Sequence, residues 1–400
     1  MIRIFVTRRV STFLVVLSCL ISAQPAPAQS EKVKAAMQPF VDGGEVAGIV
    51  TFIGGKNGLL DVQTLGMADI ENKRPMERDT IFRIASMTKP VTALAVMQLV
   101  EQGKVNIEDP VEKYLPEFKG QLLIALKDKD TEVLKKPSRP VAVKDLLTHT
   151  CGLGNYPPGL ADVYQTRNRT LSETTIAISQ TPLVFEPGSR WSYCNPGIDT
   201  LGRIVEVVSG IPYDKYLAAN IFEPLGMVDT TPYPTPEQLK RLAVTYGKEN
   251  DKLVPRPGGV LDYQNGARHP VPAGGLFSTG DDLARLYQCL LNKGTLGDRK
   301  IIGEQVLADM TTSHTGDLKA GFIEGSGWGY GVGIVKEPKG VAENLAVGSF
   351  GHGGAFGTQA WIDPTNGIYS ILLLQRSGLP NSDGSAMRKA LHDASVSFRK

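Results

Sequence analysis

The sequence predicts an α+β fold in which one antiparallel sheet is flanked by terminal helices and a mostly helical lobe is inserted between its strands. Two observations lead to this prediction. Strand-like runs concentrate near the two ends of the chain, and helix-like runs fill its middle. The 400 residues, 42% of them apolar and 21% charged, are enough for a large core and exceed one typical domain. We therefore expect two lobes that share one chain.

The first 28 residues have the pattern of a secretory signal peptide. A basic stretch precedes the apolar run Val10–Ile21, which is too short to span a membrane, and Ala26-Pro27-Ala28 offers a small-residue cleavage site. We expect cleavage near Ala28 and a periplasmic or secreted protein. The export route stays open, because Arg8-Arg9 also fits a twin-arginine signal and Cys19 a lipoprotein anchor.

Removal of this segment takes away three arginines and no acidic residue, so the formal net charge falls from +2 to −1. A nearly neutral mature chain, residues 29–400, gives no support for binding nucleic acid or an anionic membrane surface.

The N-terminal elements of the mature chain predict half of an α/β lobe, over residues 29–82. Glu31–Phe40 is a short amphipathic pattern that predicts a helix. The apolar runs Ala47–Ile53 and Leu59–Leu65 flank the turn Lys56-Asn57-Gly58, which predicts a hairpin.

The C-terminal part of the chain, from about residue 318 to residue 400, supplies the other half of this lobe. Gln359–Ile362 and Ile368–Gln375 bracket a turn with Pro and Gly and predict a second hairpin. Ser385–Phe398 predicts a closing helix. The two hairpins are expected to join in one antiparallel sheet that the terminal helices cover.

Ser86-Met87-Thr88-Lys89 is the most informative stretch of the predicted helical lobe, which spans about residues 83–317. It opens a predicted buried helix, Pro90–Gln102, that Gly103 ends. Because residues i and i+3 share a helix face, the Lys89 side chain is expected to reach the Ser86 hydroxyl. An apolar environment lowers the pKa of a lysine and lets it accept a proton, so the stretch predicts an activated serine nucleophile.

Two further motifs carry polar groups next to predicted elements. Tyr193-Cys194-Asn195 precedes a helical pattern over Ile198–Ser209. His352-Gly353-Gly354-Ala355 precedes the alternating run Thr358–Ile362, which predicts a strand edge whose glycines let a substrate lie against the backbone. For either residue in isolation, we would favour a core phenol for Tyr193 and a helix cap for Asn195.

With these three motifs in this order, the sequence resembles the serine β-lactamase superfamily, in the branch of class C β-lactamases, D,D-peptidases and family VIII carboxylesterases. The segments Asp145–Leu153, Pro224–Met227 and Ala273–Leu276 match further positions of the family. The resemblance extends from about residue 35 to the C-terminus. It implies a β-lactamase/transpeptidase-like fold for the hydrolase domain.

The resemblance also implies roles for individual residues. Ser86 would attack the substrate carbonyl and carry the acyl group, while Lys89 and Tyr193 share the proton transfers. Since a phenol titrates near pH 10, Tyr193 is a base only if cations stabilise its anion. Asn195 would offer its amide to the substrate or to the lysine. The N–H groups of Ser86 and Ala355 would form the oxyanion hole.

The third motif departs from the family's usual Lys-Thr-Gly, because His352 and Gly353 occupy its first two positions and Gly354 keeps the third. A histidine is mostly neutral at pH 7, so anchoring of a substrate carboxylate should weaken. This favours an exported carboxylesterase acting on a small-molecule ester or amide. A β-lactamase or D-amino-acid peptidase is the first alternative, and a catalytically inactive binding protein with the same fold is the second.

Cys151 and Cys194 each occupy a place where relatives often have serine. We weigh two interpretations, a disulfide in an oxidising compartment and a pair of small buried thiols. Nothing near Cys194 in the sequence marks an activated thiolate.

The sequence contains no motif for an α/β-hydrolase nucleophile or for a catalytic metal site. No serine lies in Gly-x-Ser-x-Gly, and the five histidines form no His-Glu-x-x-His pair. We therefore expect no metal and no cofactor. The oligomeric state and the natural substrate are not predicted.

Overall fold

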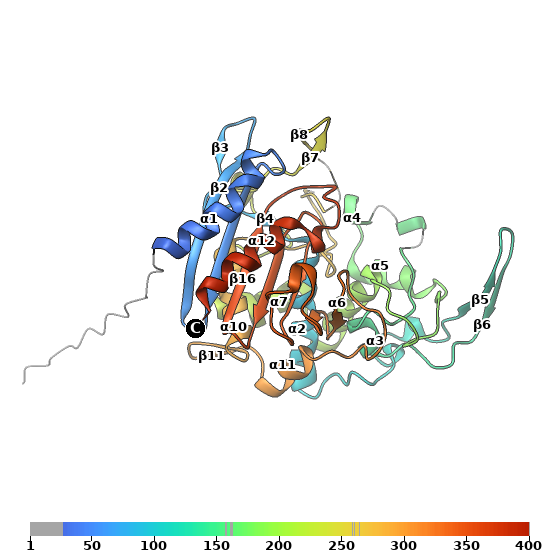
Figure 1. Ribbon diagram of the computed structural model, residues 1–400. Helices are drawn as coiled ribbons and strands as arrows, with labels where there is room; N and C mark the ends of the chain where they lie inside the picture. The colour runs from blue at the N-terminus through green and yellow to red at the C-terminus, as the bar shows by residue number, and fades with distance from the viewer. Residues whose placement is uncertain are drawn as a thin grey trace, which may run out of the picture.

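The computed structural model describes residues 27–399 (Figure 1), apart from the internal residues Pro157, Ala161, Asp162, Gly258, Val260 and Gln264. The predicted signal peptide, residues 1–28, lies outside the described residues except for Pro27 and Ala28. These two residues begin the first helix, α1 (Pro27–Asp42). Within the described ranges, no helix is long and apolar enough to cross a membrane.

An eight-stranded antiparallel sheet forms the centre of the α/β lobe, as predicted. Its order is β12-β13-β14-β15-β16-β1-β2-β3. In that order the strands are Ser326–Trp328, Gly333–Val335, Phe350–Gly353, Gln359–Asp363, Ile368–Leu373, Gly48–Gly55, Gly58–Asp69 and Arg74–Pro75. Both predicted hairpins are present, β1 with β2 and β15 with β16. They join because β1 also pairs with β16, with Val50 opposite Leu373.

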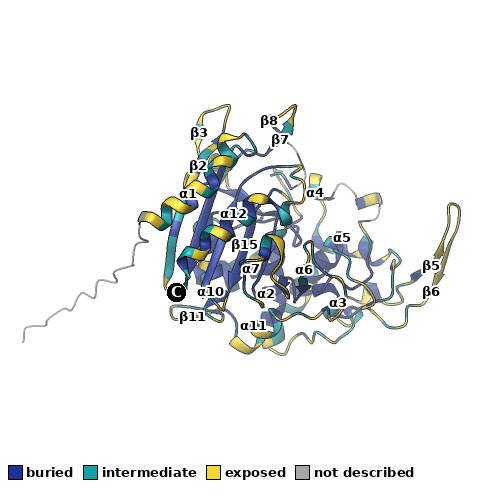
Figure 2. Cartoon of the chain, viewed as in Figure 1, coloured by how far each residue is buried: buried dark blue, intermediate teal, exposed yellow. Residues whose placement is uncertain are grey.

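The alternation of side chains along β1 assigns each face of the sheet to a different core. Ile49 and Ile53 pack in the cluster beneath α1 and α12 (Ala386–Ser395), the two terminal helices that lie side by side over the sheet (Figure 1). Val50 and Phe52 belong to the larger core that continues into the helical lobe. All eight residues of β1 are buried, as expected for a central strand (Figure 2).

The helical part of the chain supplies most of the remaining elements. Its helices are α2 (Thr88–Glu101), α3 (Val143–Leu147), α4 (Val163–Thr166), α5 (Leu171–Ser179), α6 (Asn195–Ser209), α7 (Tyr213–Leu217), α8 (Glu223–Leu225), α9 (Pro236–Lys240), α10 (Gly280–Leu291) and α11 (Glu304–Met310). Its two-stranded sheets pair β4 (Phe82–Arg83) with β9 (Phe277–Ser278), β5 (Leu123–Lys127) with β6 (Glu132–Lys135), β7 (Tyr246–Glu249) with β8 (Lys252–Pro255), and β10 (Thr295–Leu296) with β11 (Arg299–Lys300).

One helix departs from the predicted division into lobes. Helix α10 lies within the range 83–317 that we assigned to the helical lobe, but it packs against β1 and β16. The physical reason is its apolar face, which covers the side of the sheet opposite α1 and α12 and places Leu283 and Leu286 in the larger core.

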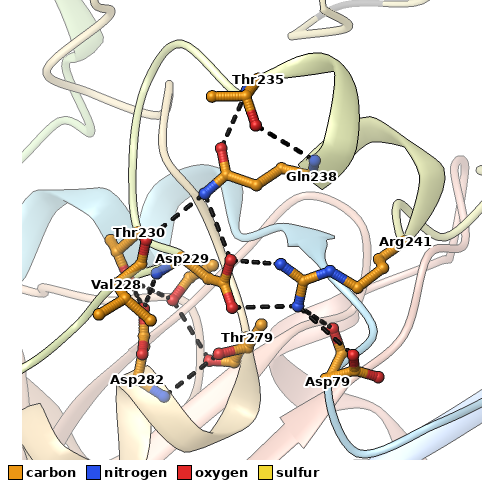
Figure 3. A network of polar contacts seen from close by, with 10 residues as sticks. Asp79, Val228, Asp229, Thr230, Thr235, Gln238, Arg241, Thr279 and Asp282 are labelled. Carbon is orange, nitrogen blue, oxygen red and sulfur yellow. Dashed lines mark hydrogen bonds and ion pairs between the residues drawn. The ribbon is translucent and has the colours of Figure 1, made fainter.

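A polar network holds the loop before α9 against the start of α10 (Figure 3). Asp282 accepts hydrogen bonds from Asp229 N at 2.7 Å and from the Thr230 hydroxyl at 2.8 Å. Arg241 pairs with the Asp229 carboxylate, and Asp79 lies 3.5 Å from the same guanidinium. This network fixes β9, which directly precedes α10 and pairs with β4 a few residues before Ser86.

Candidate active site

Ser86, the candidate nucleophile, lies on a strained turn between β4 and α2. A short 3-10 turn, Ala85–Met87, leads into α2, and Ala85 has φ of 46°, a left-handed conformation that is costly for a residue with a Cβ. Between residues 81 and 99 every side chain is buried except that of Ser86, which is partly exposed. The strain therefore presents one hydroxyl at the surface of an otherwise closed core.

Lys89 contacts this hydroxyl as predicted. Its Nζ lies 3.1 Å from Ser86 Oγ and donates a 2.6 Å hydrogen bond to the carbonyl oxygen of Ala273. The side chain is completely buried. Loss of hydration lowers the pKa of Lys89 to about 7, although the nearby carboxylate of Asp199 works in the opposite direction. A substantial fraction of the lysine is therefore neutral near pH 7 and able to accept a proton.

Tyr193 meets the same hydroxyl from the other side. Its phenol interacts with the Ser86 side chain, and Lys89 Nζ lies 4.6 Å from the centre of its ring. Burial raises the pKa of Tyr193 well above its ordinary value. The phenol is therefore protonated before the reaction. Of the two groups expected to share the proton transfers, the lysine is the one with the pKa of a base.

The helix that follows Tyr193 begins earlier than predicted, because Cys194 caps it. The Cys194 sulfur accepts a hydrogen bond from Gly197 N at 3.3 Å, and its own N–H donates to His149 Nδ1 at 3.2 Å. Asn195, for which a capping role was the alternative, is the first residue of α6. Its buried Oδ1 has no hydrogen-bond partner among the described residues.

The third motif lies at the end of β14. Strand β13 pairs with β14 only as far as Gly351, so His352 and Gly353 have β15 as their neighbour on one side alone. His352 is buried, and its Nδ1 lies 2.6 Å from the carbonyl oxygen of Gly353. Burial and the positive charge of Lys89 lower the pKa of His352 to about 3, so the ring is neutral.

Gly354 brings this strand end against the nucleophile turn. A Cβ on Gly354 would lie 2.5 Å from the carbonyl oxygen of Ile84 and 2.2 Å from Thr358 Oγ1, so only glycine fits without a shift. The next residue, Ala355, is exposed at the mouth of the site. In the described part of the chain, the N–H groups of Ser86 and Ala355 make no hydrogen bond. Both donors remain available to a negatively charged oxygen.

Asp199 is a member of the site that the sequence prediction missed. It is completely buried on α6, accepts from Ala273 N at 2.9 Å, and also accepts from the hydroxyl groups of Tyr156 and Tyr164. Burial raises its pKa to about 6. Lys89 donates to the carbonyl group of the same Ala273, so one residue links carboxylate and ammonium. The spacing of four residues from Asn195 on one helix is a signal that points to it.

Aromatic rings line the other side of the site. Trp328 lies 5.4 Å from His352 and 6.3 Å from Tyr193, measured between ring centres. Trp191 and Phe322 complete the cluster, with Phe322 centred 4.9 Å from Tyr193. A small hollow bordered by Phe322, Trp328 and His352 lies beside these rings. Sequence reasoning missed both: Phe322 comes from a distant segment of the chain, whereas Trp191 lies only two residues before Tyr193 and its position was a usable signal.

The two cysteines of the site are free, buried thiols, and the disulfide interpretation is not supported. The thiol of Cys151 hydrogen-bonds with Cys194, which together with burial raises the pKa of Cys151 well above its usual range. Both sulfurs pack against Gly197 at the start of α6. The two thiols therefore fill space at the start of α6.

Comparison with known proteins identifies the family. The family model described as Beta-lactamase matches residues 33–394. Esterase EstB of Burkholderia gladioli is 30% identical over 379 residues, covering 87% of this chain and 90% of that protein. A putative D-alanyl-D-alanine carboxypeptidase of Escherichia coli is 29% identical over 322 residues, covering 76% of this chain and 71% of that protein. The solved structure of EstCE1, described as a hydrolase with promiscuous acyltransferase activity, has a TM-score of 0.78 and 26% identity, over 92% of this chain and 98% of that one.

The fold and the juxtaposed serine, lysine and tyrosine define a serine hydrolase. Because the family model covers nearly all of the described chain, the protein belongs to the Beta-lactamase family. The family resemblance and the fold class predicted from the sequence are confirmed.

Proposed function

We propose that this protein is an exported carboxylesterase that forms an acyl-enzyme on Ser86. The observation that carries the catalytic part is the contact of one partly exposed hydroxyl with both a buried lysine, whose pKa is about 7, and a protonated phenol. EstB, which is similar over most of its length, is named an esterase.

The geometry supports the following sequence of proton transfers. Neutral Lys89 takes the proton of Ser86 as the serine oxygen attacks the ester carbonyl, and the N–H groups of Ser86 and Ala355 stabilise the resulting oxyanion. Tyr193 then donates its proton to the departing alkoxide and regains one from the Lys89 ammonium. Collapse releases the alcohol and leaves the acyl-serine. Water attacks this acyl group with the same groups in the reverse roles, which restores the free enzyme.

The strand side of the site favours a neutral ester over a substrate with an obligatory carboxylate. His352 is uncharged and aromatic rings surround it. The guanidinium of Arg388, which also borders the hollow, is stacked 4.0 Å from the centre of the Trp361 ring. The nearby Asp383 carboxylate attracts the guanidinium electrostatically. Its charge is thus partly compensated within the protein.

A D-amino-acid peptidase is the second candidate, because a similar protein from Escherichia coli is named a putative D-alanyl-D-alanine carboxypeptidase. A β-lactamase would use the same acyl-enzyme chemistry. Export to the periplasm or the medium rests on the signal pattern of residues 1–28, with a lipoprotein anchored at Cys19 as the alternative. N-terminal sequencing of the protein recovered from periplasm and medium tests this part separately.

One set of assays distinguishes the candidates. Purified protein is offered p-nitrophenyl esters, nitrocefin and a D-Ala-D-Ala peptide, with Ser86→Ala as the matched control. We expect turnover of the esters to exceed that of the other two, and the control to be inactive. Mass spectrometry of the trapped acyl-enzyme should place the acyl group on Ser86. Failure of a fluorophosphonate probe to label the wild type would favour an inactive binding protein instead.

A further inference from the structure

A two-stranded hairpin, β5 and β6, stands away from the body of the molecule (Figure 1). From Ala125 to Lys136 every residue is exposed, and Figure 2 shows the hairpin as a continuous exposed segment. Three of its large apolar side chains are among the most accessible of the described chain: Leu126 is 70% exposed, Val133 50% and Leu134 41%. An isolated two-stranded hairpin is at best marginally stable in water.

The two edges of this hairpin differ. The base of β5 is covered, because Ile124 N donates to Leu183 O at 2.9 Å and Leu183 N donates to Leu122 O at 2.7 Å. The outer edge of β6 pairs with no strand of the described chain. An exposed edge with apolar side chains is a template for pairing with another strand. The available edge is therefore β6, from Glu132 to Lys135.

Residues 132–136, which extend one residue beyond β6, are complementary to themselves in one antiparallel register. Within the hairpin, Glu132 also pairs with Lys127. With Leu134 opposite Leu134 of a second copy, Glu132 faces Lys136 of that copy, twice by symmetry. Shifting the centre to Glu132 or to Lys135 places like charges directly opposite each other, which is destabilising. Centring on Val133 pairs Asp130 with Lys136 but leaves the glutamate opposite a leucine. Of the symmetric registers centred on β6, only the one at Leu134 places Glu132 opposite a positive charge.

This register also extends an apolar row across the sheet. In the hairpin Leu134 lies opposite Ile124, and residues that lie opposite each other in an antiparallel pair share a face. Joining two copies along β6 gives a four-stranded sheet in which Ile124, Leu134 and their symmetry mates are adjacent on one face. A sheet of three or more strands with such a face is the smallest that is stable by itself.

We propose that β6 is a homodimer interface, in which two copies of this chain pair antiparallel about a twofold axis at Leu134. The isologous arrangement follows from the self-complementary strand. The interface is built from residues other than Ser86, Lys89 and Tyr193, so this inference is independent of the proposed function.

The first test measures mass by sedimentation equilibrium over a wide range of concentration. We expect the wild type to reach twice the mass of one chain, and Leu134→Lys to remain at the mass of one chain, because it sets two ammonium groups against each other on the axis. Val228→Lys is the matched control, since Val228 is 80% exposed and lies elsewhere (Figure 3). A wild type that stays monomeric, or an unchanged dimer of Leu134→Lys, would overturn the proposal.

The pairs between Glu132 and Lys136 of the two copies set the register, and exchanging the two charges tests it. Glu132→Lys and Lys136→Glu should each weaken the dimer about tenfold, since each creates two like-charge pairs. The double variant should recover the wild-type dissociation constant. Ester hydrolysis, measured in parallel, reports that each variant is folded. Additive weakening in the double variant would contradict the register.

A cysteine placed on the axis gives a second readout. In the proposed pairing the two Cα atoms of residue 134 lie about 5 Å apart, which a disulfide spans. Leu134→Cys should therefore form a covalent dimer on mild oxidation, whereas Lys129→Cys, at the hairpin tip, should not. Equal cross-linking at residues 134 and 129 would indicate random collision and contradict the proposal.

Discussion

The two sides of the candidate active site differ in how far their buried polar groups are already paired. On the lysine side, formed by Lys89, Ala273 and Asp199, each polar group has a partner within the protein. On the strand side, formed by the end of β14 and the adjacent rings, His352 Nε2 and Trp328 Nε1 are buried without a partner among the described residues.

We therefore expect the lysine side to carry out proton transfer and the strand side to discriminate between substrates. Groups that are paired in advance cost no reorganisation when charge develops, which suits proton transfer at Ser86. Groups that await a partner are satisfied only when a substrate supplies one, which suits discrimination between substrates. Substitutions on the lysine side should therefore lower kcat for all substrates, and those on the strand side should change their relative rates.

The largest effect is expected from Lys89→Arg, which keeps the positive charge but removes the base. A guanidinium stays protonated at any pH the protein survives, so it cannot take the Ser86 proton. We expect kcat to fall by about 10⁴-fold for every ester tested. Circular dichroism and thermal melting serve as controls for folding. Activity within roughly one order of magnitude of the wild type would exclude the lysine as the base.

The junction of the two sides is tested by Gly354→Ala. The new Cβ would collide with the carbonyl oxygen of Ile84 and push the Ala355 N–H away from the oxyanion. Losing one such donor costs about 10²-fold in kcat, with KM little changed. Gly159→Ala is the control, because a Cβ there meets nothing within 4 Å. An equal effect of both substitutions would indicate a general loss of stability.

The pH dependence tests how the lysine side is tuned. Lys89 acts as a base only when neutral, so kcat/KM should rise with pH through a midpoint of about 7. The Asp199 carboxylate raises the pKa of Lys89, so Asp199→Asn should move this midpoint to lower pH. The rate at about one pH unit below the wild-type midpoint, divided by the rate at about one unit above it, should be several-fold larger for Asp199→Asn than for the wild type.

Asp199 is a positioning residue, and its test must distinguish tuning from mere support. A structural role alone would lower kcat without moving the midpoint. A midpoint that moves to higher pH would contradict the electrostatic coupling between the carboxylate and the lysine.

Local spacing explains which parts of the structure were predictable. The contact between Ser86 and Lys89 follows from i, i+3 geometry, and both hairpins of the large sheet follow from turn chemistry between alternating runs. The order in which those hairpins join, through β1 and β16, depends on contacts across more than 300 residues. The sequence predicts one joint sheet but does not specify which strands pair across it.

The parts that sequence reasoning missed depend on long-range packing. Ala273 reaches Lys89 from 184 residues away, and Phe322 reaches the aromatic cluster from its own loop. The sequence predicts the burial of Lys89 and its lowered pKa, but it does not predict the burial that raises the pKa of Tyr193 and so separates the roles of the two groups. Helix α10, which lies within the range 83–317 of the predicted helical lobe, packs against β1 and β16, and this contact is also long-range.

The smallest effect, and the sharpest test of the strand side, is expected from His352→Lys. A permanent cation would replace the neutral ring at the position that corresponds, by the family resemblance, to the lysine of the Lys-Thr-Gly motif. For two esters with the same alcohol, one acyl chain neutral and one ending in a carboxylate, the ratio of kcat/KM should shift about tenfold toward the acid, or ~1.4 kcal/mol. His352→Gln is the control, because it removes the ring without adding charge. If both substitutions shift the ratio equally, space and not charge governs selection, and the division between the two sides of the site loses its electrostatic basis.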